Sequence, residues 1–306
     1  MTINKTILAA VAGVALLSAP VLAQDASSSA VPAASEASAS AASSQEVATA
    51  AADQQEPIVK QHWSFAGPFG TFDQNQLQRG FQVFKEVCSN CHSARLLAFR
   101  NLSEPGGPHF SEAQVKALAA TYQIDDPDAE GGKRPGLPSD HWPSPFPTEK
   151  DARDANGGAL PPDMSVLAKA RGVEDKFPDW LFNYFTTYAE GGPDYIHALL
   201  NAYADPPAGF TLPDGKYYNK VFAGHAIGMP PPLSDGQVQY AAAADGSTVP
   251  LTVDQYSKDV AAYLMWMAEP HLDANKAAGF RVLTFLILFA VLMYLVKNRV
   301  WRKVEH

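Results

Sequence analysis

Two cysteines and a histidine lie together in the sequence, as Cys88, Cys91 and His92. A C-x-x-C-H motif is typical of covalent haem attachment, in which both thiols form thioether bonds and the histidine ligates the iron. A C-x-x-C pair alone would also fit a thioredoxin-like redox site or half of a zinc site. The chain has only these two cysteines, and no βαβ pattern surrounds them. The motif therefore predicts one covalently attached haem c, with His92 as an iron ligand.

The second axial ligand decides whether such a haem carries electrons or binds small molecules. Met229 is the favoured candidate, because Gly228 precedes it and three prolines follow it, which gives a stiff loop that can approach closely. Met164 and the methionines of a late helix are expected to pack in the core. His225 could compete with Met229, but we expect it on the surface. A methionine opposite a histidine raises the reduction potential and closes the iron to exogenous ligands.

A helix directly before the haem motif would fix its position. One is expected from Gln74 to Val87, with Asp73 as its N-cap and apolar residues at helical spacing. Ser111 to Gln114 form a capping-box pattern that opens a second, short helix. Residues 125–162 contain eight prolines and no sustained period, so they predict a long surface excursion. After it, Asp163 is expected to cap a short helix.

Further helices are expected over residues 178–188, 193–203 and 252–269, the last opened by a capping residue. No convincing series of strands appears. The predicted fold class is mainly α: a single c-type cytochrome domain with long loops over residues 58–273, plus one C-terminal transmembrane helix.

The first 57 residues are not expected to belong to the folded domain. Residues 1–23 carry an early lysine, an apolar run and a small-residue cleavage site, which together predict a secretory signal peptide. Residues 24–57 include 12 alanines and 8 serines and have no apolar stripe, which predicts a disordered, weakly acidic arm. A helix is the alternative for this arm, since alanine favours one. Export of the domain to the periplasm fits covalent haem attachment.

A transmembrane helix is predicted over residues 274–297. Residues 282–296 form an apolar stretch of 15, and the residues before it extend the span with one charge, Arg281, near enough to the interface to snorkel. An interfacial helix is the alternative, but the stretch has no polar face. Basic residues follow it, so residues 298–306 are expected to form a cytoplasmic tail. The expected location is the bacterial cytoplasmic (inner) membrane, single-pass, with the haem domain on the periplasmic side.

The chain is acidic, with a formal net charge of −9, and most of this charge belongs to the exported part. An acidic domain argues against nucleic acid as a partner. It fits either a basic protein partner found by electrostatic steering or plain solubility, and charge alone does not separate these two.

Five ordered motifs resemble the cytochrome c1 family, the c-type haem subunits of ubiquinol–cytochrome c reductase. The similarity covers about residue 63 to the C-terminus. The motifs are Cys88–His92 and residues 156–163 (Asn-Gly-Gly-Ala-Leu-Pro-Pro-Asp), 191–195, 226–231 and 268–270.

The resemblance implies a relay that passes single electrons from a Rieske iron–sulfur protein to a soluble or membrane-anchored c-type cytochrome, in a complex with cytochrome b. The enzyme is then the whole complex, and this chain has no substrate chemistry of its own. The family's sixth iron ligand corresponds to Met229, its propionate-pairing arginine to Arg153, and a haem-packing aromatic to Phe222. The chain lacks the extra cysteine pair of some bacterial relatives, and Val166 stands where mitochondrial relatives have a tyrosine near the haem.

Two other classes of protein share parts of this pattern. A free-standing, membrane-anchored cytochrome c serving an oxidase would have the same motif and anchor, but usually a smaller domain. A haem enzyme or gas sensor needs an exchangeable sixth position on the iron.

Overall fold

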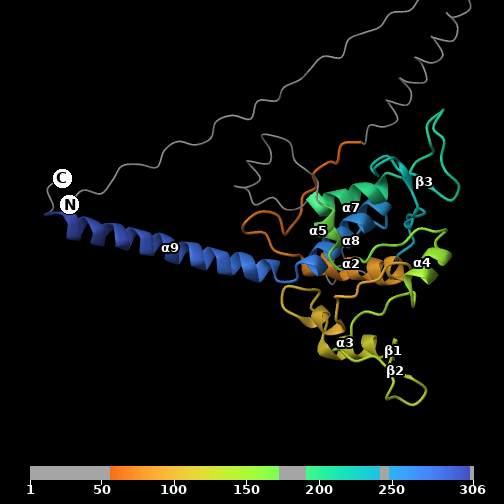
Figure 1. Ribbon diagram of the computed structural model, residues 1–306, viewed down its shortest axis with the longest axis horizontal. Helices are drawn as coiled ribbons and strands as arrows, with labels where there is room; N and C mark the ends of the chain where they lie inside the picture. The colour runs from red at the N-terminus through yellow and green to blue at the C-terminus, as the bar shows by residue number, and fades with distance from the viewer. Residues whose placement is uncertain (1–55, 172–190, 242–247, 304–306) are drawn as a thin grey trace, which may run out of the picture. The chain divides into compact units, whose positions relative to one another are not determined.

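The structure, a computed structural model, describes residues 56–171, 191–241 and 248–303 (Figure 1). The described part is mainly helical, which confirms the predicted fold class. The expected signal peptide, almost all of the expected arm and the helix expected over residues 178–188 lie outside the described residues. The elements in chain order are α2 (Gln74–Glu86), the 3-10 helices η1 (Cys88–Asn90) and η2 (Phe99–Ser103), α3 (Glu112–Ala119), β1 (Gln123–Asp125), β2 (Lys133–Pro135), α4 (Glu149–Ala155), α5 (Leu167–Ala170), α7 (Gly191–Asn201), β3 (Tyr217–Tyr218), β4 (Ala226–Ile227), α8 (Val253–Ala268) and α9 (Leu272–Trp301).

Helix α2 forms as the sequence predicts. The Asp73 carboxylate accepts a hydrogen bond from the backbone N–H of Gln76 at 2.7 Å and so caps the helix. Leu77, Phe81 and Phe84 recur on one face and are buried. The helix ends at Glu86, and η1 follows it directly. The buried face of α2 therefore fixes where the haem motif begins.

Helix α8 lies against α2, α5 and α7 (Figure 1). Gly80 allows the close approach of α2, because a Cβ atom at this position would lie 2.1 Å from the carbonyl oxygen of Asp259. Arg79, beside it, forms a two-pronged ion pair with the fully buried Asp259, at 2.9 and 3.0 Å. The α2–α8 contact is therefore close at the backbone and charged at its edge.

Aromatic side chains fill the core beside this contact. The ring centroid of Tyr263 in α8 lies 5.8 Å from that of Phe81 and 5.5 Å from that of Phe84. Trp142, from the proline-rich segment, lies 5.3 Å from Phe84. These spacings are in the range of favourable aromatic pairs. Aromatic rings from α8 and from the proline-rich segment thus both pack against α2.

Of two expectations about the middle of the chain, one is incomplete and one is wrong. Residues 125–162 lie mostly at the surface, as expected, but they include β2, in which Arg134 pairs with Ile124 of β1, and the helix α4, which Thr148 caps. Each of these elements is too short to show a period in the sequence. Asp163 is not a helix cap: α5 begins at Leu167, and its N-cap is Val166. Asp163 accepts a hydrogen bond from the N–H of Ser165 and others from residues far away in the sequence.

Helix α9 contains the whole of the expected span 274–297. This 30-residue helix is long and apolar enough to cross a membrane, and its most apolar stretch is entirely exposed. A helix that exposes apolar side chains all round requires a nonaqueous surrounding. The described chain thus has one C-terminal helix able to span a bilayer.

The tight α2–α8 contact predicts opposite outcomes for one substitution at two glycines. Gly80→Ala should lower the free energy of unfolding by about 3 kcal/mol, because the added methyl collides with the α8 backbone. Gly279→Ala in α9 meets nothing within 4 Å and should leave domain stability unchanged or slightly higher. Urea unfolding of both variants in detergent checks this. Equal midpoints for the two variants would contradict the close approach.

Candidate haem-binding site

The ring of His92 is held by one hydrogen bond. Its Nδ1 lies 2.8 Å from the backbone carbonyl oxygen of Pro162. A carbonyl oxygen can only accept, so Nδ1 carries the proton and Nε2 keeps its lone pair. The side chain is 8% exposed, and burial lowers the pKa of His92 although the bond to Pro162 opposes this. The imidazole is therefore neutral and presents Nε2, the form in which histidine binds a metal.

The two cysteines lie within one turn of this histidine. The carbonyl oxygen of Cys88 accepts from the N–H groups of Cys91 and His92, at 3.2 and 3.0 Å. Both thiols are free. Burial, with a smaller effect of Cys91, raises the pKa of Cys88 to about 12. A thiol that stays protonated is a poor redox nucleophile, which weakens the thioredoxin-like alternative.

The segment over residues 156–163 clamps the residues that follow the haem motif. Its last residue, Asp163, accepts hydrogen bonds from the Ser93 hydroxyl at 2.7 Å and from the N–H of Arg95 at 3.0 Å. Partial burial alone would raise the pKa of Asp163, but hydrogen bonds from Ser165, Arg95 and Ser93 hold it at about 2. Asp163 is thus a fixed anion that ties this segment to the chain beside His92.

The same segment lies against the loop that carries Met229. A Cβ atom on Gly228 would come within 2.9 Å of the Ala159 side chain. Behind the loop, the Tyr203 hydroxyl donates to the carbonyl oxygen of Met229 at 3.1 Å. One segment therefore contacts His92 through Pro162 and the methionine loop through Ala159.

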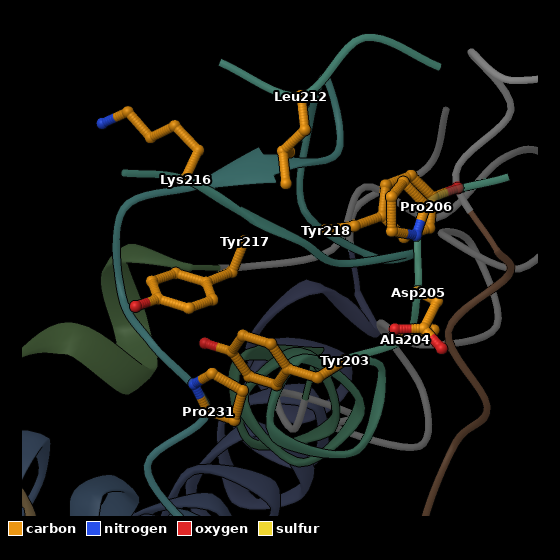
Figure 2. A pocket seen from close by; sticks show the side chains of 9 residues that line it. All are labelled: Tyr203, Ala204, Asp205, Pro206, Leu212, Lys216, Tyr217, Tyr218 and Pro231. Carbon is orange, nitrogen blue, oxygen red and sulfur yellow. The ribbon is translucent and has the colours of Figure 1, made fainter. Parts of the chain in front are cut away.

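A cavity of about 470 Å³ borders the methionine loop. Figure 2 shows Tyr203 beside Pro231, with Tyr217 facing them across the opening. Aromatic rings and prolines make up much of the wall. The cavity beside the methionine loop is thus lined largely by tyrosine and proline side chains.

His225 is buried, and its expected surface position is wrong. It is 2% exposed, and its backbone adopts a φ of 58°. Its Nδ1 lies 3.0 Å from the carbonyl oxygen of Asn219, while Nε2 has no hydrogen-bond partner. The Asn219 side chain accepts from the N–H groups of Val221 and Phe222 and turns the chain back. That turn directs His225 inward, and the signal available in the sequence was the Asn219 and Gly224 turn residues.

The two further residues suggested by resemblance lie at the periphery of these contacts. Arg153 is exposed on the last turn of α4 and donates from Nη1 to the carbonyl oxygen of Gly158 at 3.3 Å. Phe222 is half-buried in the turn before His225. Met164 is 7% exposed and packs in the core, as predicted.

The arrangement fits a haem better than a bare metal ion. Within the described ranges, no group of three or more His, Cys, Asp or Glu side chains is placed to hold an ion. What the site offers is one neutral imidazole with a free Nε2 and two free thiols one turn away. This is the donor set that covalent haem attachment requires.

Comparisons with known proteins identify the family to which the chain is related. The model of the Cytochrome C1 family matches residues 63–304. A protein named cytochrome b/c1 from Bradyrhizobium diazoefficiens is 56% identical over 243 residues, which cover 78% of this chain and 35% of that protein; the chain thus spans about a third of that relative's length. Cytochrome c1 of Blastochloris viridis is 50% identical over 250 residues, covering 80% of this chain and 86% of that protein. For cytochrome c1 of Rhodospirillum rubrum the identity is 45% over 268 residues, covering 81% and 89%. The chain belongs to the cytochrome c1 family.

Proposed function

We propose that the chain is the haem-carrying subunit of a ubiquinol–cytochrome c reductase and passes single electrons from a Rieske iron–sulfur protein to a c-type cytochrome. Membership of the cytochrome c1 family supports an electron-transport role, a haem cofactor and a place in an oxidoreductase complex. The observation that carries the proposal is the neutral His92 imidazole with a free Nε2 beside two free thiols. When bound, haem c supplies the one-electron redox chemistry.

Each residue of the site has a distinct task. Cys88 and Cys91 would hold the haem covalently, and His92 would ligate its iron through Nε2. Met229 would supply the second iron ligand, which would raise the reduction potential and exclude exogenous ligands. The carbonyl of Pro162 keeps the imidazole in one tautomer and orientation, as backbone acceptors do for metal-binding histidines.

The chain's membrane end supports the placement of the domain. Helix α9 is the anchor, and the basic residues at its end, such as Lys297 and Arg299, favour a cytoplasmic C-terminus. The haem domain then lies on the periplasmic side, where a c-type cytochrome can accept its electrons.

Protease treatment of intact spheroplasts should cleave the domain and spare the tail, and the reverse pattern would reject this orientation.

Association with its partners is the most direct consequence of the proposed function. The full chain, purified from detergent-solubilised membranes, should retain a cytochrome b and a Rieske protein. Recovery of the chain with a terminal oxidase, and without those two proteins, would point to the free-standing class of cytochrome instead. Difference spectra and mass spectrometry of the purified material read the result.

Substitution of Met229 tests the sixth ligand. Met229→Leu should lower the midpoint potential by on the order of 0.2 V, within the roughly 0.8 V that axial ligation spans, and should let the reduced protein bind carbon monoxide. Met164→Leu is the matched control, because Met164 packs in the core and should change neither property. An unchanged potential in Met229→Leu removes Met229 from this role.

The clamp at Asp163 predicts a pH-dependent stability. A pKa depressed from 3.8 to about 2 corresponds to about 2 kcal/mol of stability, present above pH 3.8 and lost as the pH falls through about 2. Asp163→Asn should therefore lose about 2 kcal/mol at pH 7, and its deficit should vanish near pH 2. Asp154→Asn, at an exposed position paired with Lys150, should lose less than about 0.5 kcal/mol. A deficit of Asp163→Asn that is the same at both pH values would contradict the clamp.

A further inference from the structure

The loop over residues 64–71, which precedes α2, is fastened to the first turns of α9 (Figure 1). The ammonium group of Lys276 donates to the carbonyl oxygens of Phe65 and Gly70, at 2.5 and 3.2 Å. The Asp273 carboxylate accepts from the N–H of Phe72 at 3.3 Å. A loop more than 200 residues away in the sequence is thus tied to the helix able to cross the membrane.

This loop is closed and stiff. The N–H of Thr71 donates to the carbonyl oxygen of Ser64 at 3.0 Å, which closes the loop on itself. Inside the turn, a Cβ atom on Gly70 would lie 2.1 Å from the carbonyl oxygen of Ala66, so the backbone is packed tightly. Phe65 is fully buried, with its ring centroid 4.9 Å from that of Phe72. The loop therefore holds its outward side chains in fixed positions.

Its outermost large apolar side chain is Phe69, which is 79% exposed. The Phe69 ring lies 6.1 Å from the ring of Phe280 in α9, edge to face. Phe280 stands one helical turn, about 6 Å along the axis, beyond Lys276. It immediately precedes Arg281, and the uncharged stretch begins at residue 282. Phe69 thus sits at the level where the charged end of α9 gives way to the apolar span.

We propose that Phe69 inserts into the lipid bilayer and that the loop over residues 64–71 is a second membrane contact beside α9. A ring held rigidly against a helix that crosses the membrane, at the point where its apolar span begins, must lie near the boundary of headgroups and acyl chains. The cationic groups of Lys276 and Arg281 are consistent with a position at this boundary, because long basic side chains place their charge among the headgroups and their methylene groups in apolar surroundings. The occupant of this surface is therefore lipid, by continuity with the span.

The second contact has a consequence for the haem domain. A domain attached by a single helix can tilt about that helix, whereas two attachments fix its tilt. The loop leads directly into α2, since the Ser64 hydroxyl accepts from the N–H of the capping residue Asp73 at 3.2 Å. Helix α2 in turn ends at Glu86, two residues before Cys88. The loop over residues 64–71 therefore sets how the haem motif stands above the membrane.

The test uses a nitroxide label at position 69 of the full chain with its cofactor. Phe69→Cys is labelled and reconstituted into phosphatidylcholine–phosphatidylglycerol vesicles, and its collision rates with oxygen and with an aqueous nickel chelate are compared. Leu137→Cys, an exposed apolar position far from α9 in the sequence, is the aqueous control, and Leu283→Cys in α9 is the lipid control. The unsubstituted chain, labelled in parallel, gives the background from Cys88 and Cys91.

We expect the label at position 69 to favour oxygen over the nickel chelate several-fold, as at position 283, while position 137 shows the reverse. A label at 69 that behaves like the one at 137 overturns the proposal. A label shielded from both reagents also overturns it, because protein and not lipid then covers Phe69. None of these outcomes depends on the identity of the axial ligands, so the result is separable from the proposed electron-transfer function.

Discussion

The hydrogen bond from His92 to the carbonyl of Pro162 is the constraint on which the site depends. It assigns the proton to Nδ1, holds the ring in one plane and leaves Nε2 as the only nitrogen with a lone pair. Burial lowers the pKa of His92 and keeps the imidazole neutral, so the ring already has the protonation state that the proposed iron ligand needs. Because the acceptor belongs to the segment over residues 156–163, the geometry of the histidine depends on where that segment is placed. The other contacts around the site fix the position of this segment.

Two sets of contacts do this. From the haem motif's side, α2 is pressed against α8 through Gly80 and bordered by aromatic rings, which fixes the position of Cys88. From the other side, the Asp163 carboxylate accepts hydrogen bonds from Ser93 and Arg95, which follow His92 in the chain. The segment over residues 156–163 also contacts the methionine loop, because Ala159 lies against Gly228. A displacement of the methionine loop would therefore be transmitted to His92 through the short, proline-rich segment over residues 156–163.

The elements that sequence reasoning could predict are those specified locally. The cap at Asp73 and the spacing of Leu77, Phe81 and Phe84 contain all that α2 needs, and the long apolar run contains all that α9 needs. Asp163 shows the limit: its local pattern suggests a helix cap, but donors 70 residues away bind it instead. His225 shows the same limit, because its burial depends on a turn made by the Asn219 side chain. The assignment of Met229 came from loop chemistry together with family resemblance, and its position beside the segment that holds His92 needed the fold.

The central proposal is that His92 and Met229 would both ligate the iron of one haem. Proton NMR of the reduced, full-length protein carrying isotope-labelled methionine methyl groups tests it most directly, because a methyl group on an iron-bound sulfur lies over the porphyrin ring current. The account predicts that one methionine methyl signal is shifted strongly upfield and that this signal is absent from a chain lacking Met229. The absence of any upfield-shifted methionine signal, or an upfield signal that survives the loss of Met229, would contradict it.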